Sequence, residues 1–186
     1  GEVASEIAVT HGARLIGTER EVTRTDGPFV CEIDGEPAWE FFKSYLPEGA
    51  ASLEAMHVAH LLLAERVPTP DAEFGDFTVR VPIRLDQPTN ALYFAAGIPS
   101  GTSVQLAIRD PEAVCERAIA AARRIVERRP GERPFLVLQL DCAGRGALLF
   151  GDATSSRLIG PVQHVFSGDV PWIGLHTYGE IAPVGG

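Results

Sequence analysis

The pattern of apolar and polar positions is clearest near the end of the chain, where it predicts two strands joined by a helix. Residues 135–140 and 172–176 form apolar runs with the length and composition of buried strands. Between them, apolar residues recur at helical spacing over residues 153–167. A strand, a helix and a second strand in this order predict two parallel neighbours, whose carboxyl ends lie at the same edge of a sheet.

The rest of the pattern predicts more strands and helices, without internal repeats. Strands are expected over residues 21–25, 29–33, 77–85, 91–96 and 103–108, and helices over residues 36–46, 52–66 and 111–129. Short turns between the last three strands favour an antiparallel meander, and Pro82 makes the first of them an edge or bulged strand. Residues 67–76 are polar and contain two prolines, which predicts a loop.

These elements predict an α+β fold. A mixed β-sheet, with an antiparallel meander and a parallel βαβ pair near the C-terminus, would be packed with about three to four helices. The clearest helix start is at Asp110, where a capping side chain is followed by Pro111 at the first helical position.

Composition and charge narrow the class of protein. At 186 residues the chain suits one main domain. A net charge of -9 argues against nucleic acid or an anionic membrane surface as a partner. The three cysteines are far apart, which fits a reducing cytoplasm better than a disulfide framework. The cysteine pattern therefore predicts a cytoplasmic chain. No apolar stretch has the length of a membrane span.

Two motifs directly follow the predicted parallel strands. Asp-Cys-Ala-Gly-Arg-Gly occupies residues 141–146, and Thr-Tyr-Gly-Glu-Ile-Ala-Pro occupies residues 177–183. Together with an Ile-Pro-Ser-Gly turn at residues 98–101, they resemble the FIST C-terminal domain. The resemblance predicts a FIST C-terminal-like domain over residues 19–186, shortened at its C-terminal end, and an N-terminal linker or edge segment over residues 1–18.

The resemblance implies an intracellular module for signal transduction. Such a module would sense a small polar molecule, for example an amino acid, and act on an attached output domain or partner protein. An N-terminal FIST domain would be a further partner, and no cofactor is implied. The family usually has an aromatic residue where this chain has His176. It also continues into one more strand after residue 183.

Reactive side chains gather in the two loops that follow the parallel strands. The expected ligand-binding residues are Cys142, Gly144, Arg145, His176, Tyr178, Gly179 and Glu180. For an amino-acid ligand, Arg145 would hold the carboxylate, Glu180 the ammonium, and Tyr178 the side chain. The alternative for Arg145 is a structural ion pair with Asp141, Asp152 or Glu180, and the alternative for Cys142 is a small buried apolar residue.

Two other functions remain open at this point. One is a cysteine-dependent hydrolase, in which Cys142 is the nucleophile and His176 the base. The other is a protein-interaction module that uses an exposed sheet edge, including one that forms a homodimer. His57 and His60 lie one helical turn apart, but the sequence offers no clear third ligand, so no metal site is expected. The main hypothesis is a non-catalytic sensory domain.

Overall fold

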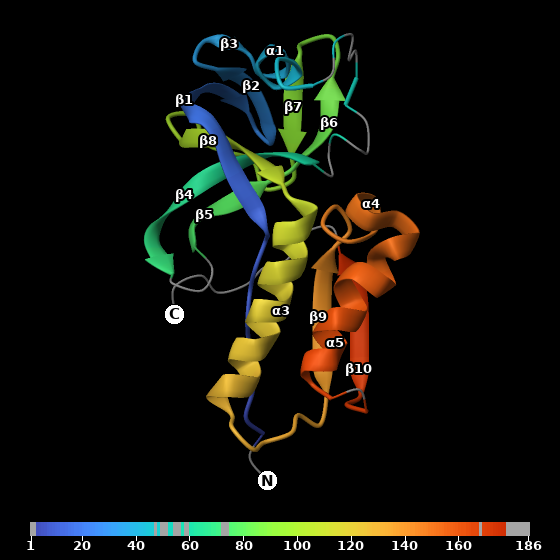
Figure 1. Cartoon of the computed structure of the whole chain (residues 1–186). Coiled ribbons are helices and arrows are strands. Elements are labelled where there is room, and N and C mark those ends of the chain that lie inside the picture. Colours follow the sequence, from blue (N-terminus) through green and yellow to red (C-terminus); the bar gives the residue numbers. More distant parts are fainter. Residues whose placement is uncertain are drawn as a thin grey trace. The chain divides into compact units, whose positions relative to one another are not determined.

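The computed structural model describes residues 3–46, 48, 52–53, 57, 60–71, 75–167 and 169–177, without the side chains of residues 68–71. The chain forms two compact units. We call residues 13–68 and 76–109 the sheet unit, and residues 1–12, 69–75 and 110–186 the helical unit. Figure 1 shows the elements of both along the colour-coded ribbon.

The sheet unit is built on an eight-stranded sheet among the described residues. Its strands are β1 (Ala13–Asp26), β2 (Phe29–Ile33), β3 (Glu36–Pro37), β4 (Leu61–Asp71), β5 (Gly75–Arg80), β6 (Pro82–Asp86), β7 (Ala91–Phe94) and β8 (Ser103–Arg109). The strand order is β5-β4-β8-β1-β2-β7-β6, and β3 pairs with β2. The short helix α1 (Ala38–Lys43) follows β3 directly.

Strand β1 joins the two halves of this sheet. Its first part pairs with β8, from Ala13 opposite Arg109 to Glu21 opposite Ser103. Its last part pairs with β2 in a hairpin formed by the strands predicted over residues 21–25 and 29–33, and Asp26 lies opposite Phe29. The register shifts between Ile16 and Arg20 around Gly17, whose φ of +66° favours glycine. The sequence predicted only the second part of β1, because the shift breaks the alternation in the first part.

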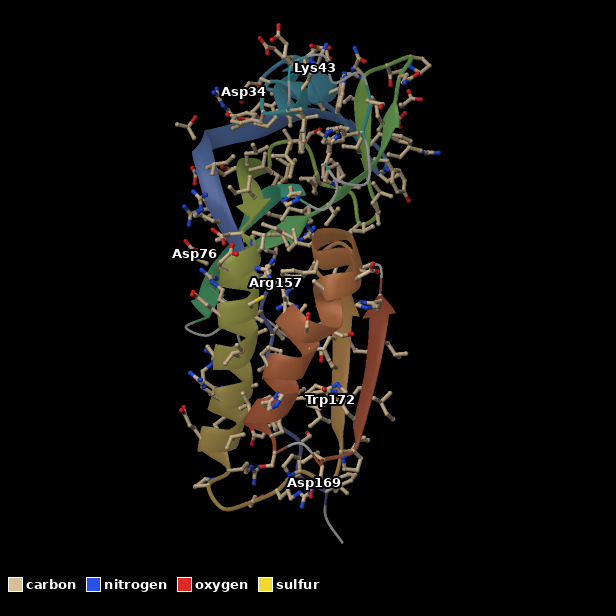
Figure 2. All side chains as sticks on the ribbon, turned by 45° about the vertical axis from the view of Figure 1, so that its right-hand side comes forward. Asp34, Lys43, Asp76, Arg157, Asp169 and Trp172 are labelled. Carbon is tan, nitrogen blue, oxygen red and sulfur yellow. The ribbon has the colours of Figure 1, made fainter. Side chains whose placement is uncertain are left out.

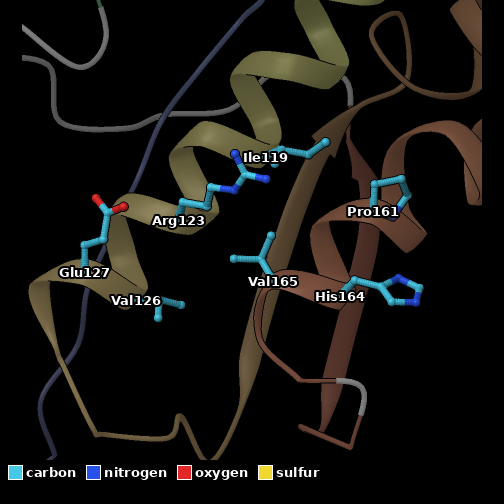
Figure 3. Close-up of a pocket in the computed structure, with 7 residues that line it drawn as sticks. All are labelled: Ile119, Arg123, Val126, Glu127, Pro161, His164 and Val165. Atoms are coloured by element: carbon cyan, nitrogen blue, oxygen red, sulfur yellow. The ribbon is translucent and has the colours of Figure 1, made fainter.

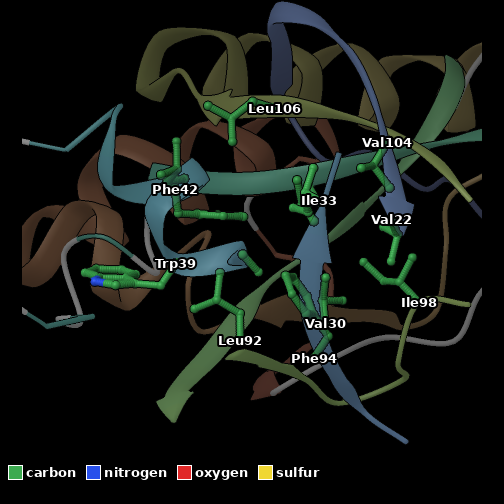
Figure 4. Packing of buried hydrophobic residues seen from close by; sticks show 13 residues of the cluster. Val22, Val30, Ile33, Trp39, Phe42, Leu92, Phe94, Ile98, Val104 and Leu106 are labelled. Carbon is green, nitrogen blue, oxygen red and sulfur yellow. The ribbon is translucent and has the colours of Figure 1, made fainter. Parts of the chain in front are cut away.

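The main core of the sheet unit lies where α1 packs on the sheet (Figure 4). Val22 from β1, Ile33 from β2 and Leu106 from β8 are nearly inaccessible to solvent there. Helix α1 contributes Trp39 and Phe42 and is shorter than the helix predicted over residues 36–46, since Glu36 and Pro37 form β3. A second cluster contains Ala13, Leu62, Ala64, Phe77 and Ala107.

The helix predicted over residues 52–66 is wrong in its second half. Leu61 to Ala64 belong to β4 and pair antiparallel with β8, where Leu61 lies opposite Ile108. Successive side chains of this strand enter different cores, since Leu61 and Leu63 join the main cluster while Leu62 and Ala64 join the second. A strand buried on both faces shows no alternation, so its apolar run resembles a helix segment.

Two further predictions for the sheet unit need correction. The predicted loop at residues 67–76 is mostly strand, because β4 extends to Asp71 and β5 begins at Gly75. The strand predicted over residues 77–85 is divided at Val81 into β5 and β6, at opposite ends of the strand order. As predicted, Pro82 lies on an edge strand with an irregular register. The meander holds only for β6 and β7, since β8 lies between β1 and β4.

The helical unit contains the long helix and the predicted parallel pair. Its elements are α3 (Pro111–Arg128), β9 (Val137–Cys142), α4 (Ala147–Phe150), a 3-10 turn (Gly151–Ala153), a π-helical turn (Ser155–Ile159), α5 (Gly160–Val165) and β10 (Trp172–Thr177). β9 and β10 are parallel and in register, with Trp172 opposite Val137. The predicted strand, helical crossover and parallel strand are therefore confirmed.

The core of the helical unit lies between α3, α5 and one face of the parallel pair. Val114, Leu158 and Val162 are buried there. Trp172, labelled in Figure 2, packs edge-on against Phe166 with 5.7 Å between ring centroids. The N-terminal segment also belongs to this unit. Glu6 forms an ion pair with Arg129, the residue directly after α3, and Gly12 lies against Val114. No strand forms at residues 7–9.

The α+β class predicted from the sequence is confirmed. The described residues contain antiparallel strands, the parallel pair, and the helices α1, α3, α4 and α5. The antiparallel strands and the parallel pair lie in two separate sheets.

Helix α3 begins after the predicted capping residue, Asp110, and replacing the Asp110 side chain should have a measurable effect on stability. The Asp110 carboxylate accepts a hydrogen bond from the Ala113 backbone N–H at 3.1 Å. Asp110→Ala is expected to lower the free energy of unfolding by about 1 kcal/mol, because that N–H loses its partner. Urea unfolding followed by circular dichroism measures the change. An Asp110→Asn variant, which keeps an acceptor oxygen, should lose much less, and equal losses in both variants would contradict a capping role.

Candidate functional site

The carboxyl ends of β9 and β10 bring the first motif to the same edge as Thr177, the first residue of the second motif. His176 lies opposite Asp141, and Thr177 lies opposite Cys142. The Ala143 backbone N–H donates to the Thr177 carbonyl at 2.8 Å, so the chain after β9 stays beside the end of β10. The residues predicted at positions 178, 179 and 180 (Tyr178, Gly179 and Glu180) lie outside the described residues.

The loop after β9 folds back tightly onto the strand end. The backbone N–H groups of Arg145 and Gly146 both donate to the Cys142 carbonyl at 2.9 Å. These two amides are therefore engaged within the protein and do not face a ligand. Gly144, Arg145 and Gly146 are all buried, so the loop is part of the packed end of the helical unit.

A buried ion pair occupies the centre of this loop. Arg145 Nη1 donates to Asp141 Oδ1 at 2.5 Å, and Arg145 Nη2 donates to the Val114 carbonyl at 3.4 Å. The side chains of Arg145 and Asp141 are only 10% and 4% exposed. The sequence left open whether Arg145 holds a ligand or forms a structural ion pair with an acidic neighbour. The structure adds that Asp141 is such a neighbour, and that the pair ties the loop to α3.

Each member of the pair retains one buried polar atom without a partner among the described residues. These atoms are Asp141 Oδ2 and Arg145 Nε. A buried acceptor or donor left unsatisfied costs about 1–3 kcal/mol, so such atoms mark places where a further polar group would be stabilised. The hydrogen-bonding capacity of the ion pair is therefore only partly used among the described residues.

His176 lies next to the open side of Asp141. A Cβ atom built on Gly146 would lie 2.8 Å from Asp141 Oδ2, 2.9 Å from His176 Cε1 and 3.2 Å from His176 Nδ1. Both side chains therefore adjoin the same point, and only glycine leaves room for them at position 146. The sequence prediction did not include Asp141 and Gly146 among the ligand-binding residues. Their positions directly before and after the Cys-Ala-Gly-Arg sequence at residues 142–145 were the available signal.

Cys142 and His176 lie on opposite faces of the parallel pair by the alternation of the strands. Cys142 is in register with Thr177, whereas His176 is in register with Asp141 on the face that packs against the helices. A nucleophile and its base must come within hydrogen-bonding reach. The register therefore argues against the hydrolase alternative, in which His176 would activate Cys142.

Another thiol of the helical unit is Cys115, on α3. Cys115 packs at the margin of the apolar core of this unit. Burial raises the pKa of the Cys115 thiol, although the charges of Arg157 and Arg145 act in the opposite direction. Because the thiolate is the nucleophile, a raised pKa makes Cys115 less reactive at neutral pH.

A groove lies elsewhere in the helical unit, between α3 and α5 (Figure 3). It has a volume of about 600 Å³ and is widely open to solvent. It is lined by Ile119, Arg123, Val126, Glu127, Pro161, His164 and Val165. None of the described residues predicted to bind a ligand lines it, so the groove is separate from the edge formed by β9 and β10.

The described part of the chain contains neither a cluster of metal-ligating side chains nor a membrane-crossing helix. There, no three or more His, Cys, Asp or Glu side chains are grouped so that they could hold a metal ion. None of the helices described is both long and apolar enough to cross a membrane.

Comparison with known proteins places the chain in a family. The sequence model of the FIST C domain matches residues 38–183. The chain is 27% identical over 183 residues to the uncharacterized protein Mb0898c of Mycobacterium bovis, covering 96% of this chain and 46% of the relative. It is 28% identical over 182 residues to the uncharacterized protein Rv0628c of Mycobacterium tuberculosis, with the same coverage of 96% and 46%. The chain thus spans about half the length of these curated relatives.

The search of solved structures returned no match for the chain. The family match covers most of the sequence, including β9, β10 and the loop between Cys142 and Gly146. The chain therefore belongs to the FIST C domain family.

Proposed function

We propose that the chain is a cytoplasmic sensory domain that binds a small polar ligand, such as an amino acid, at the carboxyl ends of β9 and β10. Membership of the FIST C domain family suggests a sensory or signal-transduction role. The observation that supports this location best is the buried pair of Asp141 and Arg145, because each side chain has one polar atom without a partner among the described residues. Ligands commonly bind where parallel strands end.

The chemistry of the open atoms favours a ligand that carries both charges. Asp141 Oδ2 accepts hydrogen bonds and suits an ammonium group, whereas Arg145 Nε donates and suits a carboxylate. Asp141 would share the ammonium with Glu180, and Tyr178 would contact the side chain of the ligand. Gly144 and Gly179 would shape the walls of the site, and His176 would close its solvent side.

Signalling would follow from a difference in ligand affinity between two conformations. A ligand shifts an equilibrium only by the difference in its free energy of binding to the two states. The loop at residues 143–146 is tied to β9, β10 and α3 by the hydrogen bonds of Ala143, Gly146 and Arg145. A ligand that completes the open side of Asp141 would therefore act on all three elements, and through them on an output domain or partner protein.

Binding of amino acids by the parent chain and its His176→Ala variant tests this proposal. At least one amino acid is expected to raise the melting temperature, since a ligand at a hundred times its Kd adds about 2.7 kcal/mol of stability. His176→Ala should weaken that binding about tenfold, because the exposed imidazole next to Asp141 is lost. Thermal shift identifies the ligand, and isothermal titration calorimetry measures both affinities.

His60→Ala provides the matched control. His60 is exposed like His176, but it lies in the sheet unit. The His60 variant should bind the ligand as tightly as the parent chain. Absence of any thermal shift across the amino acids would reject the proposed ligand class, and equal affinity of the parent and the His176 variant would reject the proposed site.

A further inference from the structure

The two-stranded parallel sheet of the helical unit has one apolar face that is uncovered. By strand alternation, Leu138 and Leu140 of β9 share a face with Ile173 and Leu175 of β10. These four side chains are 59%, 51%, 50% and 55% exposed. Helices α3 and α5 pack on the opposite face, which contributes Val137 and Trp172 to the core (Figure 1).

A parallel sheet of two strands with one bare face lacks the cover that parallel strands normally have. Parallel strands occur almost only where both faces of the sheet are covered, and an isolated pair of strands is marginally stable. Among the described residues, β9 and β10 pair only with each other. Monomeric proteins rarely expose a continuous apolar face of this kind, which is typical of an interface.

The chemistry of the face indicates an apolar partner. The outward residues of the two strands are Leu138, Leu140, Cys142, Ile173, Leu175 and Thr177, and none of them carries a formal charge. A face without cations, on a chain with a net charge of -9, does not suit nucleic acid or an anionic membrane. It suits the apolar surface of a folded polypeptide.

We propose that this face binds a domain of the kind that the longer relatives carry outside the matched region. That region makes up only 46% of the M. bovis and M. tuberculosis relatives, so more than half of each lies outside it.

The test places this chain within a longer relative. The whole chain replaces the matched region of the M. bovis protein, which presents the remaining domain at a high effective concentration. Leu175→Cys is introduced into the free chain and into the fusion, and maleimide labelling of that position is measured by mass spectrometry. Labelling should be at least tenfold slower in the fusion than in the free chain, because the face is buried there.

Ile83→Cys is the matched control, since Ile83 also lies on a strand and is 47% exposed. Its labelling should be equally fast in both proteins. Adding Leu140→Lys to the fusion should restore fast labelling at position 175, while circular dichroism verifies that the fusion remains folded. Leu138→Lys serves the same purpose if the first variant does not fold.

Three results would overturn the proposal. The first is equal labelling at position 175 in the free chain and the fusion. The second is slow labelling that persists with both lysine variants. The third is slow labelling in the free chain together with a dimer that Leu140→Lys dissociates in sedimentation velocity, which would assign the face to a second copy.

Discussion

Arg145→Ala is expected to lower the free energy of unfolding by about 3–5 kcal/mol. The substitution leaves the Asp141 carboxylate, which is 4% exposed, without the guanidinium that now pairs with it. It also removes the hydrogen bond from Arg145 to the Val114 carbonyl on α3. Urea unfolding followed by circular dichroism, with tryptophan fluorescence as a second probe, measures the loss.

Arg133→Ala separates burial from the mere loss of an arginine. Arg133 also pairs with an aspartate, Asp169, but both side chains of that pair are mostly exposed, at 57% and 73%. An exposed pair contributes only about 0–1 kcal/mol, so this variant should be nearly as stable as the parent. Replacing Arg145 and Asp141 together by apolar residues should cost less than Arg145→Ala alone, since no charge then remains buried. Similar losses for Arg145→Ala and Arg133→Ala would contradict the buried pair.

Gly12→Ala is expected to cost about 3 kcal/mol of unfolding free energy, from a backbone strain and a steric clash. The φ of Gly12 is +69°, and an added Cβ would lie 2.6 Å from Val114 Cα and 2.9 Å from Val114 N. Backbone atoms at the start of α3 cannot move aside as the end of a flexible side chain could. Chemical unfolding of the variant and the parent measures the difference.

Gly131→Ala isolates the strain from the clash. Gly131 has a φ of +79°, in the same region, and an added Cβ would meet nothing within 4 Å. It should therefore cost only about 1–2 kcal/mol, for the left-handed backbone alone. If the two alanine variants lose the same free energy of unfolding, the close approach of Gly12 to Val114 adds nothing to the cost of the Gly12 substitution.

Local signals in the sequence identified most of the helices and strands whose formation is decided by nearby residues, such as caps and turns. Asp110 and Pro111 fixed the start of α3, because capping and the φ of proline act within one turn. The strands of the β1–β2 hairpin could be predicted in the same way, because the Asp26–Gly27 turn separates them. The parallel pair was predicted from one apolar run on each side of a helical segment.

Pairing between distant strands could not be predicted in this way. Nothing near Leu61 indicates that β8 lies beside β4 and makes the run of leucines a strand rather than a helix. For the same reason, β8 was expected beside β7 and lies between β4 and β1. The register that decides these neighbours is set by contacts between segments remote in sequence.

The candidate site shows the same limit. The prediction that the two loops meet followed from the rule that parallel strands end at one edge, and the strand ends themselves do so, with Cys142 opposite Thr177. The burial of Arg145 with Asp141 depends on α3, which lies far away in the sequence. The sequence could therefore name Asp141 as one alternative partner of Arg145, but could not choose it. The roles of Tyr178, Gly179 and Glu180 remain predictions.

The pairing of β1 with β8 has a consequence for synthesis on the ribosome. Ala13 cannot meet Arg109 until nearly all of the sheet unit has been translated. At about 5–20 residues per second, on the order of ten seconds pass between the translation of the start of β1 and the translation of β8. During this interval the apolar side of β1 is available to chaperones, so nascent chains arrested before β8 should be retained by them and those arrested well after it should be released.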